Sequence, residues 1–227
     1  MHKKHKKTMK KLVKTTLTFN RHYNKMTFER VDEKMEIILA SHSPRRKEIL
    51  QNLGLSFQII TRETDESWDH AQNPEDVAMQ LSRKKALAVA EKLSGKDALV
   101  IGADTIVVFK NQIFGKPQDK ADARRTLQLL SAQTHSVISG LTLCHGSQIL
   151  TDYAETQVQF DRIPPGELER YINTNEPYDK AGGYAIQGTA ALWIRSINGC
   201  YFNVVGFPVH LFYQMQHKMG LDLFGGV

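Results

Sequence analysis

The stretch from residue 37 to 50 commits the chain to a buried strand, a tight polar corner and a helix. Residues 37–40 are apolar and favour a buried strand. Ser43 and Pro44 are typical of the N-cap and the first residue of a helix. Gly54 is expected to end that helix. A helix N-terminus therefore follows a buried strand after only a few residues.

The corner and the first helical turn carry groups that suit an anion. Ser41 and Ser43 supply hydroxyls, and Arg45 and Arg46 supply planar guanidinium forks that match phosphate oxygens. The free N–H groups and the dipole of a helix N-terminus favour negative charge as well. We interpret this segment as a phosphate cradle. The alternative is that both arginines are solvated on an ordinary amphipathic helix.

The positive charge of the chain is concentrated at one end. The net charge is +6, yet residues 1–34 hold eleven Lys and Arg against three Asp and Glu, whereas the remainder holds 19 basic and 21 acidic residues. A globular nucleic-acid binder carries its positive patch on the fold itself. The composition therefore argues against a stable nucleic-acid complex, and leaves open a binder that works through residues 1–34.

Residues 1–34 lack the apolar stretch of a signal peptide and are rich in Lys rather than in the Arg of a transit peptide. We expect a disordered extension, or a true start at Met26 or Met35. The expected folded domain is 35–220, followed by a tail at 221–227.

Two further features bear on location. No apolar run approaches the roughly 18–20 residues that a membrane-spanning helix needs, so no membrane partner is expected. Cys144 and Cys200 form no CxxC pair and lie near no histidine at ligand spacing. This argues against structural zinc and against a disulfide scaffold, and suits a reducing cytoplasm.

Apolar periodicity and turn residues predict the order of the secondary structure. The expected strands are 37–40, 57–61, 98–103, 106–109, 135–144 and 148–160, with a last hairpin of 191–194 and 200–202 around Asn198-Gly199, and the expected helices are 44–53, 74–93, 119–130, 165–172 and 208–220. Strands alternate with helices in the first half and form hairpins later. This order predicts an α/β fold with a mixed sheet and two lobes.

Asp104 is a carboxylate inside an apolar run, and we expect it and Thr105 to interrupt the strand there. An unpaired buried charge is costly, so Asp104 must find a cation, a metal or hydrogen-bond donors. Ligand sites of α/β sheets lie at the C-terminal ends of strands. Asp104 is therefore a candidate general base or metal ligand, with a structural ion pair as the alternative.

Other candidates are weaker, and each has a structural alternative. Glu66 lies in an acidic loop and could be merely solvated, and Lys85 on the long helix is more easily explained as exposed. Lys116, between Gly115 and Pro117, is suited to a fixed phosphate contact but could be a surface lysine. The amide of Gln187 could read the imide edge of a pyrimidine or be a buried structural group.

Asp179 and Lys180 are explained most simply as an ion pair that holds a turn. No Ser-His-Asp pattern and no Walker loop are present. The remaining inventory of cations, acids and an amide fits phosphoryl chemistry with a hard metal ion better than acyl transfer.

Six motifs in this order resemble the Maf proteins over roughly residues 36–219. They are SHSPRR at 41–46, GADT at 102–105, GKP at 115–117, DKAG at 179–182, IQG at 186–188 and NVVGFP at 203–208. The sequence departs from the family pattern at His42, where a small residue is commoner.

The resemblance implies a nucleoside triphosphate pyrophosphatase with two lobes about a long mixed β-sheet, flanking helices and a central cleft, similar to inosine-triphosphate pyrophosphatases. It implies Asp104 as the proton acceptor. It also implies Arg45, Thr105 and Gln187 as the residues that sort substrates, in the combination of the branch that acts on dTTP and UTP. A homodimer is common in the family, and we expect one here.

We therefore expect cleavage between the α- and β-phosphates, which removes unwanted or modified nucleotides as monophosphate and pyrophosphate. Mg²⁺ or Mn²⁺ would neutralise the phosphate oxygens, with Glu66 and Asp104 as metal contacts. The expected phosphate-binding residues are Ser41, Arg45, Arg46, Lys85 and Lys116. The rival functions are a non-catalytic regulator of septum formation and the same chemistry on a purine or modified nucleotide.

Overall fold

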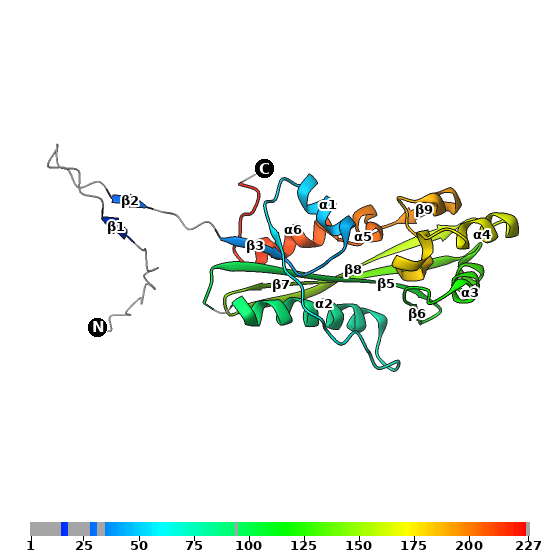
Figure 1. The fold of residues 1–227 in the computed structure, drawn as a ribbon, viewed down its shortest axis with the longest axis horizontal. Coiled ribbons are helices and arrows are strands. Elements are labelled where there is room, and N and C mark those ends of the chain that lie inside the picture. The colour runs from blue at the N-terminus through cyan, green and yellow to red at the C-terminus, as the bar shows by residue number, and fades with distance from the viewer. Residues whose placement is uncertain (1–14, 18–27, 31–34, 94, 226–227) are drawn as a thin grey trace, which may run out of the picture. The chain divides into compact units, whose positions relative to one another are not determined.

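The computed structural model describes residues 15–17, 28–30, 35–93 and 95–225 (Figure 1). The chain divides into two units, Met1–Met35 and Glu36–Val227. In the first unit β1 (Thr15–Leu17) pairs antiparallel with β2 (Phe28–Arg30). The expectation of a disordered extension falls largely outside the described residues.

The second unit contains the remaining elements. Its strands are β3 (Glu36–Leu39), β4 (Gln58–Ile59), β5 (Ala98–Phe109), β6 (Gln112–Phe114), β7 (Thr134–His145), β8 (Gln148–Phe160) and β9 (Ile194–Asn198). Its α-helices are α1 (Pro44–Asn52), α2 (Pro74–Ala90), α3 (Lys120–Leu130), α4 (Pro165–Ile172), α5 (Tyr201–Val205) and α6 (Val209–Lys218). Short 3₁₀ turns are η1 (Glu91–Leu93), η2 (Glu176–Asp179), η3 (Ala181–Gly183) and η4 (Thr189–Trp193).

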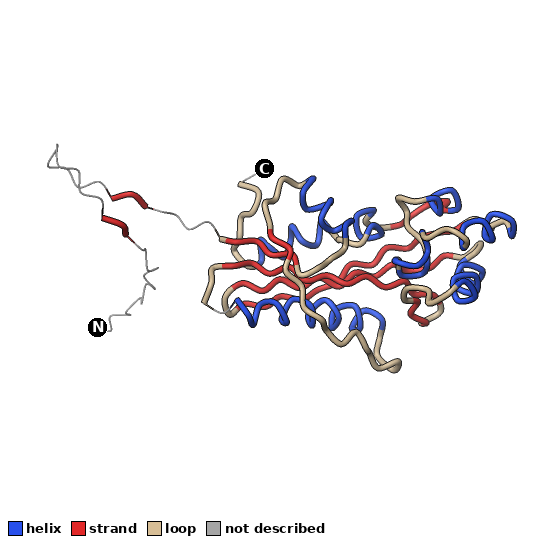
Figure 2. The backbone as a smooth tube through the Cα atoms, viewed as in Figure 1, coloured by secondary structure: helices blue, strands red, loops and turns tan. Residues whose placement is uncertain are grey.

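The strands form one seven-stranded mixed sheet in the order β4-β3-β5-β7-β8-β9, with β6 paired to β5. The β4, β3 and β5 strands are parallel, whereas β5, β7, β8 and β9 are antiparallel. Figure 2 shows the strands as a central layer with helices on both sides. The predicted α/β class with a long mixed sheet is confirmed.

The long strand β5 joins the two halves of this sheet. Its first residues pair with β3, its last residues pair with β6, and β7 accompanies it almost throughout. The predicted interruption at Asp104 and Thr105 is wrong, because both residues keep ladder pairing, with Gly140 and Ser139 of β7. The polar side chains of these two residues break the apolar sequence pattern, but the backbone hydrogen bonding of the strand continues through them.

Helix α2 lies against one face of β5 and β7 (Figure 1). Two glycines allow this close approach: a Cβ on Gly140 would lie 2.1 Å from the carbonyl oxygen of Ala78, and a Cβ on Gly102 would lie 2.5 Å from that of Ser82. Backbone-to-backbone contact of this kind brings the side chains of α2 within reach of the middle of β5.

Two apolar clusters join α2 to the sheet, and a third packs α3 and α4 against it. One cluster surrounds Val89 and Val100, and a second surrounds Leu81 and Ile106. The third cluster is built around Leu127 of α3 and includes residues of β7, β8 and α4. On the opposite face of the sheet, α5 and α6 pack against β7 and β8.

The predicted hairpin of 191–194 and 200–202 is wrong. Residues 189–193 form η4, β9 pairs with β8 instead, and residues 201–205 form α5. A type I′ turn needs positive φ at both central residues. Gly199 has a φ of 131°, but the φ of Asn198 is not positive, so this turn is not formed. The side chain of Asn203 donates to Val137 O at 2.9 Å and to Thr156 Oγ1 at 3.0 Å, which ties α5 to the sheet.

The other predicted elements are close to the observed ones. The hairpin of β7 and β8 and the helices α3 and α4 are confirmed. The strand expected at 57–61 is reduced to the two residues of β4, and α2 changes to a 3₁₀ turn after Ala90. Among the described residues, we find no helix that combines the length and the apolar character needed to cross a membrane.

We expect Gly140→Ala to lower the free energy of unfolding by about 1–3 kcal/mol, because α2 must move away from β7 to admit the methyl group. Urea unfolding measures this. Gly166→Ala in α4 is the control, since its Cβ would meet its nearest atom at 3.7 Å and should be neutral or stabilising. Equal stability of the two variants would contradict the close approach of α2.

A buried histidine predicts a dependence of stability on pH. His135 of β7 packs edge-on against Phe160 and Tyr184, and its Nε2 lies 2.6 Å from the hydroxyl of Tyr184. Burial lowers the pKa of His135 from 6.5 to about 4. The unfolded chain therefore binds more protons than the folded chain between these two pH values.

The free energy of unfolding should consequently fall as the pH drops from about 6.5 to 4, by about 3 kcal/mol from this one group. Above pH 6.5 the group contributes no pH dependence. Denaturant unfolding at several pH values should show a shallower decline for His135→Gln than for the parent chain. Parallel curves for the two proteins would show that His135 is not the titrating group.

Candidate functional site

An open cavity of about 1320 Å³ lies where several separate segments meet. Its walls come from the corner before α1, the loop after β4, α2, the middle of β5, the β6–α3 connection, the loop around η2 and η3, and the end of α5, with Val137 of β7. All nine residues that the sequence singled out for a site line this cavity: Ser41, Arg45, Arg46, Glu66, Lys85, Asp104, Thr105, Lys116 and Gln187. The structure therefore brings together the complete predicted set.

The corner before α1 is closed by its own hydroxyl group. Ser43 occupies the N-cap position and Pro44 is the first helical residue, as predicted, but the side chain of Ser43 makes no capping bond. Instead Ser41 Oγ accepts from the backbone N–H of Ser43 at 3.2 Å. Successive helical residues are about 100° apart, so Arg45 and Arg46 leave α1 in different directions.

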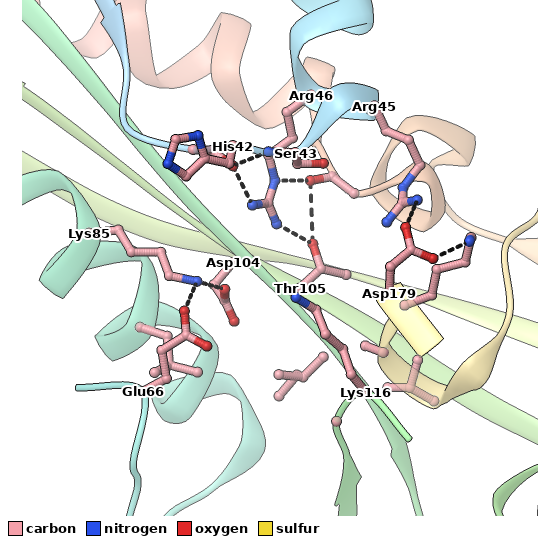
Figure 3. Close-up of a pocket in the computed structure, with 18 of the residues that line it drawn as sticks. His42, Ser43, Arg45, Arg46, Glu66, Lys85, Asp104, Thr105, Lys116 and Asp179 are labelled. Atoms are coloured by element: carbon pink, nitrogen blue, oxygen red, sulfur yellow. Dashed lines mark hydrogen bonds and ion pairs between the residues drawn. The ribbon is translucent and has the colours of Figure 1, made fainter. Parts of the chain in front are cut away.

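Arg46 is buried and contacts three segments that are far apart in the sequence (Figure 3). Its guanidinium group donates to Ser41 Oγ at 2.9 Å, to Thr105 Oγ1 at 3.1 Å and to the carbonyl oxygen of Gly206 at 2.9 Å. A guanidinium group remains protonated in proteins. Arg46 is thus a buried cation that joins the α1 corner, β5 and the end of α5.

The surroundings of Arg46 are electrostatically mixed. Burial lowers the pKa of Arg46, the carboxylates of Asp104 and Glu66 act in the opposite direction, and Arg45 adds to the lowering. The hydrogen bonds of the Arg46 guanidinium group fix its position, and burial removes most of its contact with water. A ligand anion that enters the cavity would restore part of that lost solvation.

Arg45 faces the opposite rim of the cavity. Its Nη1 lies 3.5 Å from Asp179 Oδ2, and Asp179 Oδ1 accepts from Lys180. The ion pair of Asp179 and Lys180 that the sequence suggested is therefore present. Lys180 also donates to the carbonyl oxygen of Glu176 at 2.7 Å, which closes the turn.

Asp104 lies at the floor of the cavity and contacts an ammonium group. Lys85 of α2 donates to Asp104 Oδ1, and the same Nζ lies 2.9 Å from Glu66 Oε1 (Figure 3). The interpretation of Lys85 as exposed is wrong, because 18% of its side chain is accessible and it contacts both carboxylates. The close approach of α2 at Gly102 explains why Lys85 reaches β5.

Glu66 is exposed for 63% of its side chain, yet it is not merely solvated. The hydrogen bond from Lys85 lowers the pKa of Glu66, and the charges of Lys85, Lys116 and Arg46 add to this effect, against the opposing influence of partial burial. A loop residue therefore faces the cations of three different elements.

Thr105 and Lys116 occupy the wall next to Asp104. Thr105 Oγ1 lies 2.8 Å from Ser139 Oγ and also contacts Arg46, so its hydroxyl is held inside the protein. Lys116 is exposed and its side chain points toward Thr105 (Figure 3). The backbone beside it is fixed, because Gly115 O accepts from Gly182 N at 3.0 Å.

Gln187 is exposed in the loop between η3 and η4 and lines the cavity. The idea of a buried structural amide is therefore wrong. Its loop is anchored on both sides. Tyr184 contacts His135, while the Glu176 carboxylate lies so close to Gly188 that a Cβ there would meet Oε1 at 1.9 Å.

The carboxylates of Glu66 and Asp104 share one cationic position, which Lys85 Nζ occupies in this structure. Two carboxylate groups about a common point are suitable ligands for a hard divalent cation, which also accepts phosphate oxygens and water. Within residues 35–93 and 95–225, no group of three or more His, Cys, Asp or Glu side chains is placed to hold a metal alone. The site thus fits an ion that shares its ligands with a substrate.

Sequence reasoning missed the carbonyl of Gly206, the hydroxyl of Ser139 and the ammonium of Lys84, which donates to the loop that carries Glu66. The first two gave no local signal, since a carbonyl is present at every residue and a lone serine is common. The Lys84-Lys85 pair is a visible signal, because two adjacent cations on a helix near an acidic loop suggest a contact between them.

The two arginines should differ in their effect on stability. We expect Arg46→Met to lower the free energy of unfolding by about 2–4 kcal/mol, because two buried acceptors and one partly buried acceptor lose a charged donor. Arg45→Met should change it by less than about 0.5 kcal/mol, since its ion pair is exposed. Chemical denaturation measures both values. A small effect for both variants would disprove the structural role assigned to Arg46.

Comparisons with known proteins agree with the motifs. The chain is 44% identical over 191 residues to the dTTP/UTP pyrophosphatase of Clostridium botulinum, an alignment that covers 82% of this chain and 98% of that protein. It is 43% identical to the dTTP/UTP pyrophosphatase of Symbiobacterium thermophilum, with 84% and 97% covered, and 42% identical to that of Bacillus anthracis, with 83% and 97% covered.

Among solved structures, the Staphylococcus aureus Ham1 protein is similar with a TM-score of 0.46 at 12% identity, covering 81% of this chain and 99% of that chain. The family described as Maf-like protein matches residues 36–219. That range includes the whole cavity, the sheet and every helix of the second unit. The chain belongs to the Maf-like protein family.

Proposed function

We propose that this protein is a nucleoside triphosphate pyrophosphatase that hydrolyses dTTP and UTP to the monophosphate and pyrophosphate. The names of its relatives support the substrate. The observation that carries the proposal is the Asp104 carboxylate at the floor of a cavity whose walls carry Arg45, Arg46, Lys85 and Lys116. A polyanion bound by these cations would lie beside a proton acceptor in the same cavity.

The cations divide between fixed and adjustable contacts. Arg46 is held by the protein and supplies a preorganised charge, the arrangement that stabilises developing negative charge most effectively. Lys116 is exposed and Arg45 takes part in an exposed ion pair, so both side chains can follow the phosphates of a bound nucleotide. Ser41 offers its hydroxyl between these groups and the helix N-terminus.

Asp104 acts as general base in the proposed reaction. A water molecule attacks the α-phosphorus and gives a proton to the Asp104 carboxylate, while the bond from the α-phosphorus to the bridging oxygen breaks and pyrophosphate leaves. Lys85 holds the Asp104 carboxylate in place through its ammonium group. Lys85 was predicted to bind phosphate, and its contacts here add the orientation of two carboxylates to that role.

Glu66 and Asp104 are the residues that would hold Mg²⁺ or Mn²⁺ in this enzyme. When bound, such an ion neutralises phosphate oxygens and supports the leaving group. The position that the two carboxylates share about Lys85 Nζ would suit such an ion.

Substrate choice follows from the opposite rim. The amide of Gln187 offers one acceptor and two donors, which match the N–H and the carbonyls of thymine and uracil. Thr105 contributes to substrate choice through its contact with Arg46. Arg45 contributes through its ion pair with Asp179 in the loop around η2 and η3. We place the enzyme in the cytoplasm, where it removes unwanted nucleotides, and homodimerisation stays a prediction from the family resemblance.

Asp104→Asn should lower kcat for dTTP and UTP by about 10²–10⁴-fold, because the amide keeps the shape of the side chain but accepts no proton. The measurement is pyrophosphate release with a panel of pyrimidine, purine and modified nucleoside triphosphates, with Mg²⁺ omitted and restored. Asp152→Asn on β8, outside the cavity lining, is the matched control.

The parent chain should hydrolyse dTTP and UTP faster than the purine nucleotides, and the control variant should match it. Near-full turnover by Asp104→Asn would overturn the assignment of the base. A purine or methylated nucleotide as the best substrate would overturn the assignment of Gln187, and no hydrolysis of any nucleotide would overturn the function.

A further inference from the structure

Lys84 is the neighbour of Lys85 on α2, and it contacts the backbone of the loop that carries Glu66. Its Nζ donates to the carbonyl oxygen of Asp65 at 3.0 Å and to the carbonyl oxygen of Ser67 at 3.1 Å. These two residues flank Glu66. The ammonium group of Lys84 therefore holds the chain on both sides of the carboxylate that Lys85 binds.

Residues 65–67 form a tight turn that is closed by the side chain of Asp65. Asp65 Oδ1 accepts from the backbone N–H of Ser67 at 2.9 Å, and its Oδ2 accepts from Ser67 Oγ at 2.6 Å. Lys84 Nζ also lies 3.8 Å from Asp65 Oδ2. The turn thus directs both carbonyl oxygens toward α2, where they accept hydrogen bonds from the one ammonium group of Lys84.

The loop has few other anchors near this point. The preceding strand β4 is two residues long, and Glu66 itself is exposed for 63% of its side chain. Trp68 packs on the apolar cluster that joins α2 to the sheet. Lys85 contacts the Glu66 carboxylate itself, and the two carbonyl contacts of Lys84 hold the backbone on either side of it.

We propose that Lys84 is a positioning residue that holds Glu66 at the shared cation position beside Asp104. Lys84 is not part of the cavity lining and acts through the backbone of residues 65–67. The inference rests on the proposed function in one respect: the oriented Glu66 would serve the divalent cation of the pyrophosphatase reaction.

The test uses Lys84→Met, which keeps the aliphatic stem and removes the ammonium group, and Lys84→Arg, which keeps a cationic donor. Lys92→Met is the matched control, because Lys92 is an exposed lysine of η1, the 3₁₀ turn that follows α2. Glu66→Gln and the double variant Lys84→Met/Glu66→Gln complete a mutant cycle.

The first measurement needs no turnover. Hydrogen exchange of residues 62–69 in the metal-free protein should be about tenfold faster in Lys84→Met than in the parent chain, because local opening of the loop becomes easier. Lys84→Arg and Lys92→Met should exchange like the parent. Unchanged exchange in Lys84→Met would overturn the proposal, and so would faster exchange throughout the second unit.

The second measurement is the Mg²⁺ concentration that gives half-maximal pyrophosphate release from dTTP. Lys84→Met should raise it about tenfold with a smaller effect on the KM for dTTP, and Lys84→Arg should restore it. In the Glu66→Gln background the further effect of Lys84→Met should fall below about twofold. An equal effect in both backgrounds would overturn the proposal, since Lys84 would then act independently of Glu66.

The two failures are distinguishable. A parent chain that hydrolyses no nucleotide would overturn the proposed function, while the exchange of residues 62–69 would still decide whether Lys84 holds the Glu66 loop.

Discussion

The buried guanidinium group of Arg46 is the interaction on which the site depends. It connects the corner before α1, the middle of β5 and the carbonyl of Gly206 at the end of α5. No apolar contact could fix these three segments with comparable directionality, because each bond has a defined donor and acceptor. The cost of burying the cation is offset by these bonds and by the carboxylates that face it.

Two pairs of adjacent cations divide their tasks in the same way. In each pair one side chain donates to backbone carbonyl oxygens of another segment, Arg46 on α1 and Lys84 on α2, and its neighbour, Arg45 or Lys85, contacts a carboxylate in the cavity lining. Arg46 lines the cavity as well. The rotation of the helix between neighbouring residues produces this division. A short basic dipeptide can thus both build a loop and supply a ligand contact.

Local signals were sufficient for much of the fold, and together with the family resemblance they indicated which residues line the site. Asp104 stood out because a carboxylate within an apolar strand demands a partner, and the corner before α1 was visible from Ser43 and Pro44. Partners distant in sequence, such as Gly206 for Arg46, left no local trace. The false hairpin at Asn198-Gly199 shows the same limit, because Asn203 is held by β7 and β8 and this tertiary contact overrides a strong turn signal.

The unbroken course of β5 separates chemistry from recognition. Asp104 belongs to a strand paired over ten positions with β7, whereas Gln187 belongs to a loop at another side of the cavity. Mutations in that loop can therefore alter which nucleotide is bound without displacing Asp104, the proposed proton acceptor. Related sequences can therefore change their substrate range through this loop while the strand that carries the carboxylate stays the same.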